Sequence, residues 1–180
     1  MARINIPDYD ASPDQSRPLL DAVSAQLGTI PNLFRLLALS PAALTGTLEL
    51  NGALARTLDA KTRERIALAV AEVNGCDYCL SAHSYLAANL AKLDPAEIAA
   101  NRRGHSYDAR ADAAVSFAHK IIQTRGKVSD ADLASVRHAG FTDAQIVEIV
   151  VNVAVNVLTN LMNNVAQTDI DFPVVRGGAA

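Results

Sequence analysis

Residues 59–83 read DAKTRERIALAVAEVNGCDYCLSAH and predict two helices joined by a tight break. Asp59 directly precedes an apolar-periodic segment, which is the position of a helix N-cap residue. Gly75 can take the left-handed conformation that ends a helix, so we expect the first helix to stop at about Asn74. A second helix then begins at Cys76, and the two helices form a hairpin about Gly75.

The rest of the chain has similar helix-capping and helix-ending residues. It predicts an all-helical fold, a bundle of about eight helices. No segment shows the sustained period-two alternation of a half-buried strand. The long last helix opens with the capping box Thr142-Asp143-Ala144-Gln145. We expect one domain over residues 1–180, with its core at about 30–166 and an irregular tail over 169–180. The segments expected to be helical are 14–27, 31–39, 41–58, 59–74, 76–93, one that opens at 94–97, 109–124, 129–139 and 142–166.

Composition supports this fold class and excludes one kind of partner. Half of the 180 residues are hydrophobic but only 4% are aromatic, and small aliphatic side chains suit close helix–helix packing. The net charge is −3 and the longest basic run is Arg102-Arg103, so we expect no nucleic-acid partner. The apolar last helix and the small-residue composition predict that the chain associates with another protein surface.

The sequence predicts neither a targeting segment nor a membrane span. Residues 1–10 lack the apolar run of a signal peptide. The most apolar stretch, 146–162, is interrupted by Glu148 and three asparagines, which a membrane helix would hardly tolerate. We therefore expect a cytoplasmic protein with no membrane partner.

The residues that can carry chemistry lie in the second helix of the hairpin. The chain has two cysteines, Cys76 and Cys79. A disulfide between them would close too short a loop to stabilise the fold. The free N–H groups at a helix start favour a thiolate there, and helical spacing puts the two Cα atoms about 5–5.5 Å apart, within disulfide range. His83 follows Cys79 by four residues, lies on the same face and leans back toward it, so it is a candidate base.

Glu64 can reach this group across the hairpin. Glu64 lies eleven residues before Gly75 and His83 lies eight after it, a mismatch of about 4.5 Å at the helical rise. Side chains on helices packed about 8–10 Å apart can close such a gap, directly or through a water. Glu64, His83, Cys79 and Cys76 are then candidates for a proton relay that ends on a disulfide-forming pair.

Other interpretations of the same residues stay open. A zinc site could use Cys76, Cys79, His83 and Glu64, although structural zinc usually draws a second ligand pair from another segment. We therefore expect no resident metal, and we expect no cofactor. Haem attachment requires a histidine directly after the second cysteine, where this chain has Leu80.

Two neighbouring features have both a functional and a packing interpretation. Tyr78 is a candidate substrate-binding residue, because its hydroxyl could donate to a peroxide oxygen, but it could equally be a partly buried packing residue. Four asparagines share one face of the last helix and form either a polar seam at a helix–helix or subunit contact, which we favour, or part of an access route to the thiols. These asparagines are Asn152, Asn156, Asn160 and Asn164.

At these residues the chain resembles the AhpD-like alkylhydroperoxidase / carboxymuconolactone decarboxylase family, in its peroxidase-related subgroup. The peroxidase branch of that family carries a glutamate, eleven further residues and then C-x-x-C-x-x-x-H. Glu64, Cys76, Cys79 and His83 stand at that spacing. Residues 156–173, NVLTNLMNNVAQTDIDFP, are similar to the C-terminal region of the subgroup. The resemblance covers the chain from about residue 30 onward.

The resemblance implies an all-helical homo-oligomer, a dimer, trimer or hexamer, that reduces hydroperoxides with a dithiol and serves antioxidant defence. It makes Cys79 the attacking thiolate, activated by His83 and Glu64, and Cys76 the residue that resolves the sulfenic acid as a disulfide. It also implies a dithiol reductant or a lipoyl-bearing protein as partner. Tyr78 departs from the histidine that some members carry before the second cysteine, which removes one proton donor.

Two other functions fit the same scaffold. One is a lyase of the carboxymuconolactone decarboxylase kind, acting on a lactone acid. That branch lacks the cysteine pair, so Cys76 and Cys79 argue against this activity. The other is a non-enzymatic module that holds zinc or senses redox state.

Overall fold

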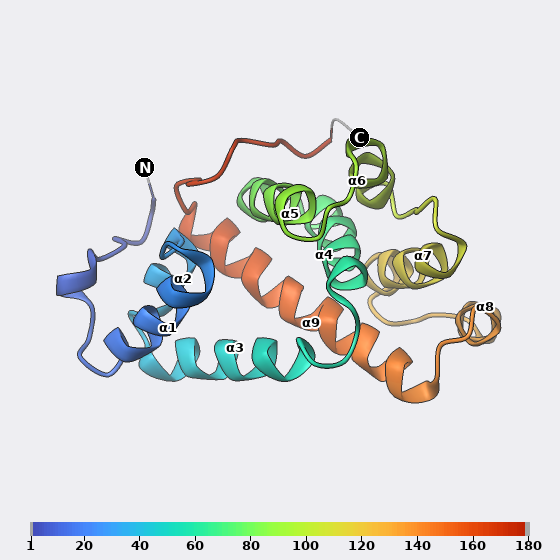
Figure 1. Cartoon of the computed structure of the whole chain (residues 1–180), viewed down its shortest axis with the longest axis horizontal. Coiled ribbons are helices and arrows are strands. Elements are labelled where there is room, and N and C mark those ends of the chain that lie inside the picture. Colours follow the sequence, from blue (N-terminus) through green and yellow to red (C-terminus); the bar gives the residue numbers. More distant parts are fainter. Residues whose placement is uncertain (1, 179–180) are drawn as a thin grey trace.

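The computed structural model describes residues 2–178 and is all-helical over that range, as the sequence predicts (Figure 1). It has nine α-helices there, one for each of the segments expected to be helical. A 3-10 turn, η1 (Tyr9–Ala11), precedes them. The helices are α1 (Arg17–Leu27), α2 (Asn32–Leu37), α3 (Pro41–Leu54), α4 (Ala60–Val73), α5 (Asp77–Asn89), α6 (Pro95–Arg102), α7 (Ala109–Thr124), α8 (Asp130–His138) and α9 (Asp143–Ala166).

Two helices form the centre of the bundle. α4 packs against α5, α6, α7 and α9, and the six consecutive residues from Ile66 to Ala71 are all buried. A helix that is covered on all sides has no polar face, which explains the run IALAVA in its second half. α9 crosses the molecule diagonally and also contacts α2, α3, α5 and α7 (Figure 1). Its Ile149 and Val153 join Ile66 and Val70 of α4 in the main apolar core.

Polar side chains cap several helix starts, among them the predicted N-cap residue Asp59, whereas the Asp94–Glu97 capping box that the sequence also indicates does not form, because the Glu97 side chain bonds to Arg65. The side chains of Ser40, Asp59 and Asp94 each accept a backbone N–H three residues ahead, at the starts of α3, α4 and α6. Thr142 forms the predicted capping box with Gln145 at the start of α9. Gly75 has φ +58°, the left-handed conformation that reverses the chain between α4 and α5.

Three predicted helix boundaries are wrong by three or four residues. α1 begins at Arg17 and not at residue 14, because the buried Ser16 hydroxyl donates to the Ala38 carbonyl, 2.7 Å away, and ties the chain to the end of α2. α3 ends at Leu54 and not near residue 58, because the Thr57 hydroxyl donates to the Leu54 carbonyl and closes a turn. α5 ends at Asn89 and not at residue 93, because Lys92 has a left-handed φ of +57°.

Residues 169–178, which we call the C-terminal strap, contain no helix or strand, as the sequence predicts. The strap leaves the end of α9, crosses α5 and reaches the neighbourhood of α6 (Figure 1). The last two residues of the tail predicted over 169–180 lie outside the described residues.

The helix α9 is long and apolar enough to cross a membrane by length and composition, with a mean hydropathy of 1.5 over its most apolar window. In this fold one face of α9 packs in the core, and 39% of that window is buried. Its Asn152, Asn156, Asn160 and Asn163 side chains lie on the buried side.

Candidate active site

The two cysteines form a disulfide at the start of α5. Cys76 is the N-cap residue of this helix, and its Sγ accepts the backbone N–H of Cys79 at 3.3 Å. Their Cα atoms are 5.3 Å apart, within the range that the helical spacing predicts. Cys76 is 0% exposed and Cys79 3%, so the dithiol is enclosed by protein. The sequence predicted the pairing, but not the depth of burial.

Glu64 and His83 meet across the α4–α5 hairpin. The Nδ1 atom of His83 lies 2.9 Å from Oε2 of Glu64, at hydrogen-bond distance. Each side chain is about one-fifth exposed, at 22% for His83 and 20% for Glu64. His83 also stands one helical turn after Cys79 on α5. The structure therefore joins Glu64 to His83 and Cys76 to Cys79, and the helical spacing of α5 puts the two pairs one turn apart.

Asn163 is part of the site and was missed by the sequence reasoning. It comes from α9, 84 residues after Cys79, and its Nδ2 atom donates to the Cys79 Sγ at 3.3 Å. Its side chain is buried, and its Oδ1 atom has no hydrogen-bond partner. Asn163 directly precedes Asn164 of the predicted asparagine face, but it lies off that four-residue register, so the spacing did not point to it.

The four asparagines of the predicted face make contacts away from the cysteines. Asn160 accepts from the Asn74 side chain at 2.8 Å, and Asn164 donates to the Asn74 carbonyl at 3.0 Å, so both hold the end of α4 against α9. Asn152 and Asn156 donate to carbonyls of the preceding turn of α9. The contacts with Asn74 form a polar seam between helices, which is the interpretation that the sequence favoured.

Tyr78 faces away from solvent, toward α2 and the strap. Its hydroxyl oxygen accepts the backbone N–H of Leu33 at 3.1 Å, and its ring meets Phe172 edge-on with centroids 5.9 Å apart. Burial raises the pKa of the Tyr78 hydroxyl well above its ordinary value, so this side chain stays protonated. These contacts describe a packing residue between two segments, and substrate contact by Tyr78 stays a prediction.

The C-terminal strap closes one side of the dithiol. Ile170, Phe172 and Val175 of the strap pack on the apolar cluster that contains both cysteines. The Val175 N–H donates to Ser81 Oγ of α5 at 2.9 Å, which fixes the strap along this helix.

Charged contacts fix the far end of the strap. Arg176 pairs with Asp77 at 2.7 Å, and the Gly177 N–H donates to the same carboxylate at 2.9 Å. Burial opposes ionisation of Asp77, but these two donors outweigh it and hold the pKa of the carboxyl below its ordinary value. The Gly178 N–H donates to Glu72 at 2.6 Å, next to the end of α4.

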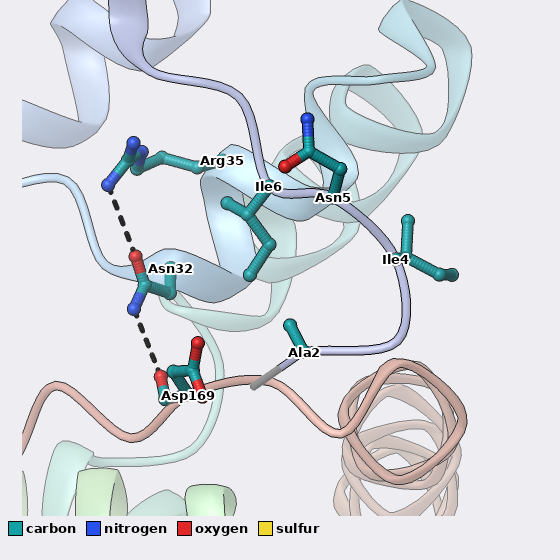
Figure 2. Close-up of a pocket in the computed structure, with 7 residues that line it drawn as sticks. All are labelled: Ala2, Ile4, Asn5, Ile6, Asn32, Arg35 and Asp169. Carbon is teal, nitrogen blue, oxygen red and sulfur yellow. Dashed lines mark hydrogen bonds between the residues drawn. The ribbon is translucent and has the colours of Figure 1, made fainter.

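Two other features concern a possible metal site and a surface pocket. Among residues 2–178, no three His, Cys, Asp or Glu side chains converge on a position that could hold a metal ion. One surface pocket lies where the N-terminal segment meets α2 and the start of the strap, and Figure 2 shows Arg35, Asn32 and the Asp169 carbonyl joined there by hydrogen bonds. That pocket contains none of the predicted site residues.

Comparison with known proteins finds one family model that matches part of the chain. The model of the carboxymuconolactone decarboxylase family matches residues 41–123, a segment that includes Glu64, both cysteines and His83. A comparison with curated proteins finds no match.

Solved structures with the same fold cover nearly the whole chain. A peroxidase-related protein from Ralstonia eutropha, described as an alkylhydroperoxidase AhpD core, is 27% identical with a TM-score of 0.84, over 94% of this chain and 92% of its own. A peroxidase-related protein from Silicibacter sp. is 25% identical with a TM-score of 0.82, over 93% and 91%. The debrominase Bmp8, in complex with 2,3,4-tribromopyrrole, is 17% identical with a TM-score of 0.78, over 94% and 91%, and shares the fold alone.

Proposed function

We propose that this chain is a member of the AhpD-like carboxymuconolactone decarboxylase family that reduces hydroperoxides through the Cys76–Cys79 dithiol. The observation that carries the proposal is the disulfide at a helix N-terminus with the Glu64–His83 pair one turn away. A helix N-terminus favours a thiolate, and a histidine paired with a carboxylate can take and return a proton.

The first step is attack by the Cys79 thiolate on the terminal oxygen of the hydroperoxide. The S–O bond forms and the O–O bond breaks, so Cys79 becomes a sulfenic acid and an alkoxide leaves. The alkoxide takes a proton from His83 and departs as the alcohol, while Glu64 stabilises the histidine cation before that transfer. Cys79 is assigned the attack because His83 stands one turn after it on the same face of α5.

The second step closes the disulfide. The Cys76 thiolate attacks the sulfur of the sulfenic acid, the S–S bond forms, and hydroxide leaves and is protonated to water. The Cα separation of 5.3 Å lets this happen with α5 in place. A dithiol reductant then returns both cysteines to thiols with two electrons. We propose a small dithiol or a lipoyl-bearing protein for this role, in the reducing cytoplasm, with the chain acting as a homo-oligomer in antioxidant defence.

The test is the intact mass of the reduced protein after one equivalent of an organic hydroperoxide. We expect the wild type to lose two hydrogens, Cys76→Ser to carry one trapped sulfenic acid, and Cys79→Ser to stay unmodified by one equivalent. An unchanged wild-type mass over many minutes would contradict the proposal.

Two alternatives make different predictions in the same assay. A lyase on this scaffold would keep its activity after alkylation of both thiols. A zinc or redox-sensing module would retain stoichiometric zinc on purification without added metal, or would change its assembly on oxidation without turnover.

A further inference from the structure

We propose that Asn163 is a further catalytic residue of this site, which binds the Cys79 thiolate with its NH₂ group and the hydroxyl of the incoming hydroperoxide with its carbonyl oxygen. The inference rests on the proposed function. It starts from the 3.3 Å contact between Asn163 Nδ2 and Cys79 Sγ. Among the residues described, this is the hydrogen bond that the Cys79 sulfur receives from outside its own helix.

The chemistry of the two partners fixes how the amide is oriented. A thiolate can only accept hydrogen bonds, so the asparagine must present its NH₂ group to the sulfur. The carbonyl oxygen of the same amide then points elsewhere. In the structure Asn163 is 3% exposed and its Oδ1 atom has no partner. A buried acceptor without a partner is unfavourable, and a ligand that donates a hydrogen bond to it would remove that cost.

A second unpaired group lies close by on α9. Asn160 is fully buried and uses its Oδ1 atom to accept from Asn74, while its Nδ2 atom has no partner. Asn160 and Asn163 are three residues apart and therefore neighbours on the helix surface. The residue that contacts the Cys79 sulfur thus has one unused acceptor, and its neighbour on α9 has one unused donor.

A hydroperoxide matches that pair. Its terminal O–H donates a hydrogen bond and its oxygens accept one, whereas a dialkyl peroxide has no donor. A hydrogen bond from the terminal O–H to Asn163 Oδ1 would hold this oxygen next to Cys79 Sγ for attack. When the S–O bond forms and the O–O bond breaks, that hydrogen stays on the transferred oxygen. The sulfenic acid therefore keeps the same bond to Asn163, and the leaving alkoxide is protonated from the His83 side.

Buried polar atoms without partners also occur away from the site, as at Asn101 Oδ1 and Thr168 Oγ1. Asn163 differs from both because the other atom of its amide already contacts the reacting sulfur. This double role gives the proposal a specific signature, since the loss of the amide should affect both the thiolate and the peroxide.

The experiment compares Asn163→Leu with Asn156→Leu, a buried asparagine seven residues earlier on α9 that bonds to the Asn152 carbonyl. Two rates are measured on the reduced full-length protein: single-turnover oxidation by an alkyl hydroperoxide, and alkylation by iodoacetamide as a function of pH. For Asn163→Leu we expect oxidation to slow by about 10-fold or more, as for a hydrogen bond to a charged group, and the alkylation profile to move to higher pH. Asn156→Leu should leave both unchanged.

A wild-type oxidation rate and an unmoved alkylation profile in folded Asn163→Leu would overturn the proposal. If Asn163→Leu fails to fold, the side-chain amide of Asn163 in the wild type is followed by NMR, and its ¹⁵N and ¹H shifts must change when the disulfide is reduced. Unchanged shifts would also overturn it. If the wild type does not react with hydroperoxide at all, the proposed function fails, and with it the peroxide-binding part of this inference, while the alkylation profile still tests the contact with the thiolate.

Discussion

Two neighbouring residues of α4 each pair with a residue of another helix, and the carboxylates of the two pairs differ in burial and in hydrogen bonding. Glu64 reaches His83 on α5, and Arg65 reaches Glu97 on α6 at 2.7 Å. The Glu97 carboxylate is 6% exposed and also accepts from Asn101, Ser106 and the Tyr107 N–H. The Glu64 carboxylate is 20% exposed and has His83 as its hydrogen-bond partner among the described residues.

The difference separates a structural carboxylate from one that can handle protons. Burial alone would raise the pKa of Glu97, but the hydrogen bonds from Ser106, Tyr107 and its other partners outweigh burial and lower it to about 2. Such a group stays ionised throughout the neutral range and holds α4, α6 and the loop after α6 together. Glu64 keeps access to solvent, and its partner His83 carries an imidazole, a group that can both donate and accept a proton.

The largest effect that we expect is the loss of stability in Glu97→Gln. The substitution preserves size but leaves the Arg65 guanidinium, 12% exposed, without its counter-charge. Breaking a buried pair in this way costs about 3–5 kcal/mol. Urea denaturation of the variant should show this loss, while the peroxide rate per folded molecule should equal that of the wild type. A variant as stable as the wild type would mean that the Glu97 cluster contributes little to the fold.

The pH dependence of the stability difference provides the control for this prediction. Because the folded-state pKa of Glu97 lies at about 2 and its ordinary value is 4.5, its contribution is complete above pH 4.5 and is lost as the pH falls toward 2. The stability difference between wild type and Glu97→Gln should therefore shrink over that window. A difference that stays constant with pH would exclude the carboxylate charge as its cause.

Replacing Glu64 by glutamine should give the reverse result, a lower peroxide rate with nearly unchanged stability. Glu64→Gln leaves His83 without a carboxylate to stabilise its cation, so we expect the rate of single-turnover peroxide reduction to fall by roughly 10²-fold, at the lower end of general acid–base effects. Because the pair is partly exposed, the free energy of unfolding should change by less than about 1 kcal/mol. Stopped-flow oxidation and urea denaturation of the matched variants measure both quantities. A large loss of stability with an unchanged rate would make Glu64 a second structural carboxylate.

The sequence predicts the part of the site that depends on local geometry. Asp59, Gly75 and the helical spacings define one hairpin, and the hairpin brings Glu64 to His83 and forms the cysteine pair. These contacts span at most 19 residues within two adjacent helices, so cap chemistry and helical rise are enough to find them.

The missed contacts all join distant segments. Asn163 meets Cys79 across 84 residues, and Arg65 meets Glu97 across 32. Neither pair has a fixed spacing, because the first depends on how α9 packs on α5 and the second on how α6 packs on α4. Glu97 also shows how a local signal can mislead: its position three residues after Asp94 predicts a capping box, but in the fold its side chain turns inward to Arg65.

The smallest effect that we expect concerns the C-terminal strap. The strap packs on the buried Cys76–Cys79 disulfide, which a reductant must reach. Arg176 pairs with Asp77 and is 67% exposed, so Arg176→Ala should change the free energy of unfolding by less than about 1 kcal/mol. Loss of this contact should nevertheless raise the frequency of local strap opening, since small local openings are governed by few contacts. We therefore expect reduction of the Cys76–Cys79 disulfide by dithiothreitol to become a few-fold faster.

The matched control is Arg137→Ala, which removes another exposed arginine–carboxylate pair, the one with Asp143. Hydrogen exchange of the Val175 and Gly177 amides, which bond to Ser81 and Asp77, should accelerate in Arg176→Ala and not in Arg137→Ala. Faster exchange at these amides without faster disulfide reduction would mean that the reductant approaches the dithiol from another side. Equal behaviour of the two variants would show that the strap's end is not what limits access to the sulfur atoms.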